Sequence, residues 1–177
     1  MMSDETLGVA DITEILRLLP HRYPFLLVDR VINMRGDQHG VGIKNLTMNE
    51  WQFGHSAENP VMPGVLVIEG IAQTACVLAL RLMPPTERRR IMFFMSIDKA
   101  KFRKPARPGD TLEYHVDKIA QRRNMCWYRG EAKVDGVLVA EARCVLSRRA
   151  RSEDSIRNGA NLFGSPTVLL MNSSNRC

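Results

Sequence analysis

The sequence predicts an α+β fold in which an antiparallel sheet of about six strands wraps around one long central helix. Two observations support this architecture. The longest apolar stretch runs from Val65 to Met83, and shorter segments rich in Val, Ile and Leu flank it on both sides. A helix that is hydrophobic on nearly every side must be enclosed, and a sheet with one apolar face can enclose it.

The individual elements follow from spacing and turn residues. Asp11 and Glu14 have the spacing of a capping signal, and apolar residues at helical intervals then predict a short helix that a proline ends. Periodicity is lost over residues 50–63, which predicts a loop leading into a long helix over residues 64–83. Asp135-Gly136 is a tight-hairpin signal. The expected strands are residues 25–33, 39–45, 91–102, 111–120, 125–134 and 137–147.

Length and composition indicate one domain. The 177 residues are 45% hydrophobic, which is enough apolar material for one sizeable core. We place the domain at residues 1–147 and expect the polar, charged tail at residues 148–177 to be poorly ordered. Residues 1–10 lack the basic start and apolar run of a secretory signal, which favours a cytoplasmic location. Charged residues interrupt the long apolar stretch, so a buried helix is favoured over a membrane span.

Charge and cysteine content argue against several classes of protein. The net charge of +6 favours acidic partners. The arginine runs at residues 88–90 and 148–151 lack interleaved aromatic residues and any nucleic-acid module, so we expect neither nucleic acid nor membrane as partner. Metal-ligand spacing and phosphate-binding glycine loops are also missing, so no metal or other cofactor is expected. Cys76, Cys126 and Cys144 lie among apolar neighbours and are expected to be reduced core residues.

The segment from Gly54 to Glu69 carries the candidate chemistry. It places His55 in a proline-bounded loop, Gly64 at a helix start, and Glu69 within the next two helical turns. An imidazole with an ordinary pKa of about 6.5 suits a general base. Desolvation by apolar neighbours is expected to raise the pKa of Glu69, which suits a general acid. Free amides at the helix start are suited to hold negative charge on a substrate oxygen.

Structural roles compete with each of these assignments. A lone loop histidine is usually exposed or structural, and a proline-glycine pair can simply begin a helix. A hydrogen bond from Gln73, four residues along the same helix face, would satisfy Glu69 without any catalysis. The other histidines are weaker candidates: His21 lies in a turn and is expected to bond to backbone, while His39 and His115 lie on expected strands with no evident partner.

Three motifs carry a resemblance to a known family. They are Leu19-Pro20-His21-Arg22-Tyr23-Pro24-Phe25-Leu26-Leu27-Val28-Asp29-Arg30, Asn59-Pro60-Val61-Met62-Pro63-Gly64-Val65 followed by Glu69, Ala72 and Gln73, and Asp98-Lys99-Ala100-Lys101-Phe102-Arg103 with Pro108-Gly109-Asp110. The chain resembles the FabZ-type 3-hydroxyacyl-(acyl carrier protein) dehydratases from about Ile12 to Leu146.

The resemblance implies a hot-dog fold and the dehydration of 3-hydroxyacyl chains in type II fatty acid biosynthesis and lipid A biosynthesis. It implies that His55 and Glu69 are the acid/base pair and that Gly64, with its neighbour Val65, binds the substrate thioester. It also implies homodimers, usually assembled as trimers of dimers, in which His55 of one subunit faces Glu69 of the other. The implied partner is the acidic acyl carrier protein, which suits a basic chain. Glu rather than Asp at position 69 favours simple dehydration over dehydration with isomerisation.

The chain departs from the family pattern beside the expected base. Ser56-Ala57 stands where the family typically has Phe-Pro, and we expect a looser loop, since displacing a base by about 1 Å costs on the order of a hundredfold in rate. Two alternatives stay open: a hot-dog thioesterase whose helix carboxylate activates water, and a binding module that holds acyl carriers without turnover. Phe93, Phe94 and Met95 are candidates for tunnel walls, although plain core is the commoner role.

Overall fold

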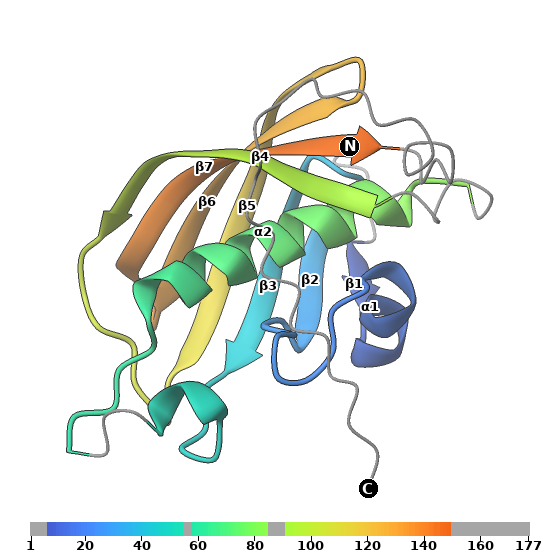
Figure 1. The fold of residues 1–177 in the computed structure, drawn as a ribbon. Coiled ribbons are helices and arrows are strands. Elements are labelled where there is room, and N and C mark those ends of the chain that lie inside the picture. Colours follow the sequence, from blue (N-terminus) through green and yellow to red (C-terminus); the bar gives the residue numbers. More distant parts are fainter. Residues whose placement is uncertain (1–6, 55–57, 85–90, 150–177) are drawn as a thin grey trace, which may run out of the picture.

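The computed structural model describes residues 7–54, 58–84 and 91–149, which form one sheet curved around one long helix (Figure 1). The strand order is β1-β2-β3-β5-β6-β7-β4, and every neighbouring pair is antiparallel. The helices are α1 (Ile12–Leu18), the 3-10 turn η1 (Trp51–Phe53) and α2 (Gly64–Arg81). The strands are β1 (Gly8–Ala10), β2 (Arg30–Arg35), β3 (His39–Asn45), β4 (Ile91–Phe102), β5 (Thr111–Arg122), β6 (Met125–Val134) and β7 (Val137–Arg149).

This architecture confirms the expected α+β, hot-dog fold. The long helix and the strands from β3 onward lie at or within a few residues of the expected bounds. Asp135 and Gly136 join β6 to β7 with positive φ angles of 49° and 75°, which is the tight turn that their composition indicates. The expected cap is also present, since the Asp11 carboxylate accepts a hydrogen bond of 2.8 Å from the Glu14 amide at the start of α1.

The start of the chain differs from the expectation in two places. The structure adds a short strand, β1, whose residues Gly8 and Ala10 pair with β2. Three residues are too few to show an alternating pattern, so only the tertiary pairing reveals this strand. The first expected strand also begins too early: β2 starts at Arg30, and the backbone of Phe25 and Leu27 bonds to the Gln73 side chain instead of a neighbouring strand.

Helix α2 is enclosed by the concave face of the sheet. Fourteen of its eighteen residues are buried, so a helix long and apolar enough to cross a membrane serves here as the core of the fold. The helix and the sheet can approach closely because Gly42 of β3 has no side chain. A Cβ at this position would lie 2.1 Å from the Thr74 Oγ1 atom. Cys76, Cys126 and Cys144 are buried and unbridged, as expected for core thiols.

Gly42→Ala is expected to destabilise the protein by about 1–3 kcal/mol, because the added methyl group overlaps Thr74 and forces helix and sheet apart. Chemical denaturation would measure the free energy of unfolding. Gly54→Ala is the matched control, since a Cβ there meets its nearest described atom at 3.4 Å. Adding Thr74→Ala to Gly42→Ala should restore part of the loss. Equal stability of the Gly42 and Gly54 variants would show that the approach is not tight.

Candidate active site

Glu69 lies in the second turn of α2, where most neighbouring positions are buried. Its side chain is 18% exposed. Burial raises the pKa of the Glu69 carboxyl above its ordinary value, and a hydrogen bond from Gln73 opposes part of that shift. The carboxyl therefore holds its proton to a higher pH than an exposed glutamate does, which is the property that a general acid needs.

Gln73 is the principal partner of Glu69 among the described residues. Its Nε2 atom donates to Glu69 Oε1 at 2.9 Å and to the Phe25 carbonyl at 2.8 Å, while its Oε1 atom accepts from the Leu27 amide at 2.9 Å. The side chain is 1% exposed. The structural role considered from the sequence, a bond between Gln73 and Glu69, is thus present, and it coexists with a carboxyl whose pKa burial raises.

His21 is a site residue that sequence reasoning underrated. Its Nε2 atom lies 3.6 Å from Glu69 Oε1, too far for a hydrogen bond but in direct contact. Burial, helped by the neighbouring Arg22 charge, lowers the pKa of His21, which favours a neutral imidazole. The expectation that His21 merely bonds to backbone is wrong. The one signal in the sequence that pointed to a site role for His21 was its place in the Leu19-to-Arg30 motif.

The other two histidines assessed from the sequence have partners after all. His39 Nδ1 lies 2.8 Å from Asp117 Oδ1, and His115 Nε2 lies 3.0 Å from Glu113 Oε2. Pairing of β3 with β5 sets His39 directly opposite Asp117, a contact between residues far apart in the sequence. These pairs lie on the sheet and do not contact Glu69.

His55, with Ser56 and Ala57, lies outside the described residues, and the described segment that leads to it is η1 with Gly54. The Trp51 indole in η1 donates a hydrogen bond of 2.8 Å to the Pro24 carbonyl. This bond joins the turn before His55 to the same loop that Gln73 holds through Phe25 and Leu27.

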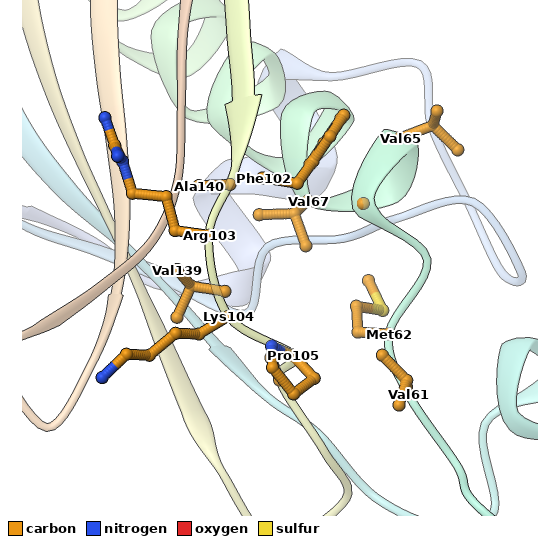
Figure 2. Close-up of a pocket in the computed structure, with 12 residues that line it drawn as sticks. Val61, Met62, Val65, Val67, Phe102, Arg103, Lys104, Pro105, Val139 and Ala140 are labelled. Atoms are coloured by element: carbon orange, nitrogen blue, oxygen red, sulfur yellow. The ribbon is translucent and has the colours of Figure 1, made fainter.

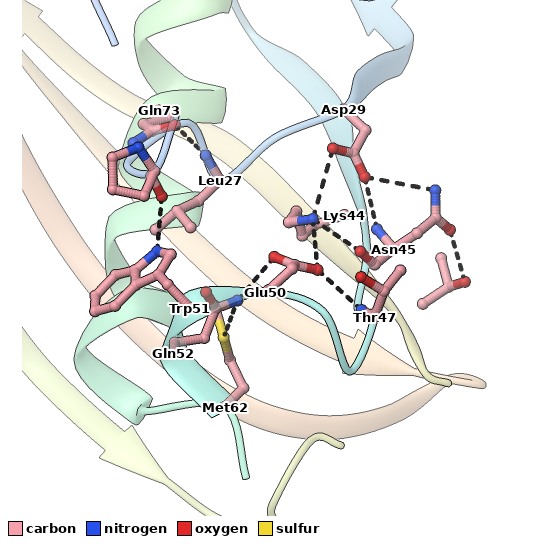
Figure 3. A network of polar contacts seen from close by, with 12 residues as sticks. Leu27, Asp29, Lys44, Asn45, Thr47, Glu50, Trp51, Gln52, Met62 and Gln73 are labelled. Atoms are coloured by element: carbon pink, nitrogen blue, oxygen red, sulfur yellow. Dashed lines mark hydrogen bonds and ion pairs between the residues drawn. The ribbon is translucent and has the colours of Figure 1, made fainter. Parts of the chain in front are cut away.

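An ionic network around the buried Lys44 side chain supports this turn from the other side (Figure 3). The Glu50 carboxylate accepts hydrogen bonds from the Thr47 amide at 2.9 Å, from Lys44 Nζ at 3.0 Å and from Gln52 Nε2 at 2.8 Å. The Lys44 side chain is 8% exposed and also lies 3.7 Å from the Asp29 carboxylate. Since a buried charge requires compensation, these contacts restrict Lys44 and Glu50 to one arrangement.

A pocket of about 420 Å³ opens between the start of α2 and the end of β4 (Figure 2). Gly64 and Val65 begin the helix, and their amides have no hydrogen-bond acceptor within the described ranges. The Phe102 ring lies against Gly64, where a Cβ would meet it at 2.5 Å. The wall is largely apolar, and Arg103 and Lys104 line the same pocket. An apolar chain with a polar carbonyl at its end fits these surroundings.

Comparison with known proteins identifies close relatives. A family model described as a FabA-like domain matches residues 19–143. The 3-hydroxyacyl-[acyl-carrier-protein] dehydratase FabZ of Rhodopseudomonas palustris strain BisB18 is 55% identical over 143 residues, which cover 80% of this chain and 95% of that protein. The protein of the same name from Nitrobacter hamburgensis is 57% identical over 133 residues, covering 75% and 88%.

Solved structures share the fold at low sequence identity. The dehydratase heterocomplex ApeI:P from Xenorhabdus doucetiae superposes with a TM-score of 0.68 at 19% identity, covering 81% of this chain and 95% of that one. A hypothetical thioesterase protein from Streptococcus pneumoniae gives a TM-score of 0.53 at 15% identity, covering 68% and 84%. At these identities the likeness concerns the fold alone.

Lys44→Met is expected to lower the free energy of unfolding by about 3 kcal/mol, because it removes a buried cation and leaves the partly buried Glu50 carboxylate without its partner. Lys101→Met is the matched control: its side chain is 63% exposed and lies 3.9 Å from Glu141, so its loss should cost less than about 1 kcal/mol. Urea denaturation of both variants compares the two losses. Similar losses would mean that the Lys44 network contributes no more than a surface ion pair.

Proposed function

Because the chain belongs to the family of FabZ 3-hydroxyacyl-[acyl-carrier-protein] dehydratases, we propose that it converts (3R)-3-hydroxyacyl-[acyl-carrier-protein] to the trans-2-enoyl product in type II fatty acid biosynthesis. The observation that carries this proposal is family membership across nearly the full length of relatives of that name. The raised pKa of the buried Glu69 carboxyl supports it independently. The protein would act in the cytoplasm as a hydro-lyase.

The proposed mechanism divides the work between two side chains. His55 removes the proton from the carbon beside the thioester carbonyl, and Glu69 protonates the departing hydroxide so that water leaves. The amides of Gly64 and Val65 hold the negative charge that develops on the thioester oxygen. These amides have no acceptor among the residues that the structure describes, and this, with their position at the start of α2, supports the assignment.

The partner of the reaction is an acyl carrier protein in this proposal. Fatty-acid carriers of this type are acidic, and the chain carries a net charge of +6. Lys104 adds positive charge where the pocket opens beside the end of β4, and Arg103, which pairs with Glu141, lines the same opening. This position suits a carrier that delivers its acyl chain into the pocket.

A homodimer, assembled further into a trimer of dimers, completes the proposed site. Strand β4 is an edge of the sheet, with β7 on one side and no described strand on the other. Four of its apolar side chains, Phe93, Phe94, Met95 and Ile97, are between 38% and 57% exposed. The structure therefore contradicts a core role for the first three. A second copy would cover this apolar edge and bring its own His55 to Glu69.

A hot-dog thioesterase and a non-catalytic acyl-carrier binding module are the competing functions, and one assay separates all three. Formation of the conjugated enoyl thioester from a 3-hydroxybutyryl carrier gives an absorbance rise, whereas a thioesterase releases free thiol. A binding module would bind the carrier and give neither signal.

His55→Ala and Glu69→Gln are each expected to lower the dehydration rate by about 10²–10⁴-fold, since each removes one half of the acid/base pair. The absorbance assay measures this. A loss of activity in Glu69→Gln would not be explained by unfolding. The pKa of Glu69 is raised in the folded protein, so ionisation of this carboxyl lowers the free energy of unfolding once the pH rises above the ordinary pKa of a glutamate. The amide variant should be at least as stable at pH 7. An active Glu69→Gln enzyme would remove Glu69 from the mechanism.

Met95→Asp is expected to convert the dimer to monomers and abolish dehydration, because it places a charge on the apolar edge of β4. Light scattering measures the mass in solution, and the absorbance assay measures activity. Ile119→Asp is the control, since Ile119 is an apolar residue on β5 that is 51% exposed. A Met95→Asp protein that stays dimeric and active would place the interface elsewhere.

A further inference from the structure

The segment that carries His55 lies between two described stretches, and a side-chain hydrogen bond holds each stretch. Before His55, the Trp51 indole donates to the Pro24 carbonyl at 2.8 Å. After it, Arg107 Nη1 donates to Asn59 Oδ1 at 2.5 Å. Trp51 and Asn59 stand four residues before and four residues after His55. The two bonds therefore restrain the backbone on both sides of the proposed base.

Arg107 belongs to a tight turn whose backbone is itself well bonded. The Arg107 amide donates to the Asp110 carboxylate at 2.8 Å, and the Asp110 amide donates to the Arg107 carbonyl at 3.0 Å. Gly109 closes the turn with a φ of 99°, a conformation that other residues rarely adopt. The Arg107 side chain therefore extends from a fixed point, which a restraint on a neighbouring segment requires.

The same turn, residues 106–110, contacts the chain on both sides of His55. On the side before it, the backbone of Leu46 bonds to the turn twice, at 3.0 and 2.9 Å. On the side after it, the Met62 amide donates to the Ala106 carbonyl at 2.8 Å. The turn is thus a common support for the two stretches, and joining both ends to one support reduces the arrangements open to the chain between them.

The residues that follow His55 explain why outside support matters here. Ser56-Ala57 stands where the FabZ family typically has Phe-Pro. A proline fixes its own φ angle and restricts the residue before it, whereas serine and alanine allow many more backbone conformations. Since a base displaced by about 1 Å loses on the order of a hundredfold in rate, a chain without that proline gains from bonds that hold its two ends.

We propose that Arg107 is a positioning residue for the base, and that its bond to Asn59 supplies restraint that Ser56-Ala57 does not. The inference rests on the proposed function, in which His55 removes the proton. In this role Arg107 acts through Asn59 and the backbone and need not touch the substrate. Both partners are exposed side chains, and an exposed bond to a charged group changes a population by a few-fold. The effect on the rate is therefore small but measurable.

Carrier docking is the alternative role for this charge, because Arg107 follows Ala106, which lines the pocket beside α2. The test therefore uses the 3-hydroxybutyryl thioester of a small thiol, which has no carrier protein to dock. Enoyl absorbance gives kcat and KM for Arg107→Met, which removes the donor, and for Asn59→Ala, which removes the acceptor. Arg129→Met is the matched control, since it loses the same charge from β6, where Arg129 is 55% exposed and lies 3.6 Å from Asp117.

We expect Arg107→Met to lower kcat about fivefold with KM unchanged, because the productive position of His55 is populated less often. Asn59→Ala should give the same loss, and the double variant no further loss, since all three remove one bond. Arg129→Met should change neither constant. Equal losses in Arg107→Met and Arg129→Met, or additive losses in the double variant, would overturn the proposal. So would an effect of Arg107→Met confined to KM for the carrier-borne substrate.

A second background connects the effect to Ser56-Ala57. With Ser56→Phe and Ala57→Pro in place, the segment has its own proline, and Arg107→Met should then lower kcat by less than about twofold. A loss of about fivefold in this background as well would show that Arg107 acts for another reason, and it would contradict the proposal.

Hydrogen exchange at the Met62 amide tests the restraint without relying on activity. This amide bonds to the Ala106 carbonyl, beside the bond to Asn59, so it should exchange about fivefold faster in Arg107→Met and at the wild-type rate in Arg129→Met. A wild-type enzyme that forms no enoyl product would remove the proposed function, and the exchange rates would still decide whether Arg107 holds the segment. An active enzyme whose kcat and Met62 exchange are both unchanged in Arg107→Met would overturn the inference alone.

Discussion

Helix α2 must be enclosed on nearly every side and yet carry an ionisable side chain, and the rest of the structure accommodates this constraint. Burying a carboxyl costs several kcal/mol unless it is protonated or hydrogen-bonded. The protein uses both means at Glu69: apolar surroundings favour the proton, and one buried amide, Gln73, supplies the bond. The curved sheet, the close approach at Gly42 and the buried thiols all follow from wrapping such a helix.

The loop from Pro24 to Leu27 connects two parts of the proposed mechanism that no regular element joins. Gln73 holds this loop through the backbone of Phe25 and Leu27, and Trp51 holds it through the Pro24 carbonyl. The proposed acid on α2 and the turn that leads to His55 thus share one support. Hydrogen bonds to a fixed backbone serve here as the preorganised positioning that acid/base catalysis depends on.

Periodic and local signals in the sequence were sufficient for most of the fold but not for the details of the site. Alternating apolar residues and the Asp135-Gly136 turn located the strands from β3 onward, and the long apolar run located α2. Strand β1 and the contact between His21 and Glu69 depend on pairing between distant segments, which no local pattern encodes. The residues before Arg30 looked like a strand because they are rich in apolar side chains, of which Leu27 and Val28 are buried, while the Leu27 amide bonds to a side chain instead of a neighbouring strand.

The position of β4 has a consequence for how the protein is made. All neighbours in the sheet follow chain order except β4, which pairs with β7, so that Ile91 lies opposite Arg149. During synthesis the chain completes α2 and β4 well before the strand that holds β4 in place. Until β7 emerges, a strongly apolar helix and an apolar strand lack part of their cover, and such intermediates are prone to aggregate. We therefore expect the nascent chain to depend on chaperones until its last strand has been synthesised.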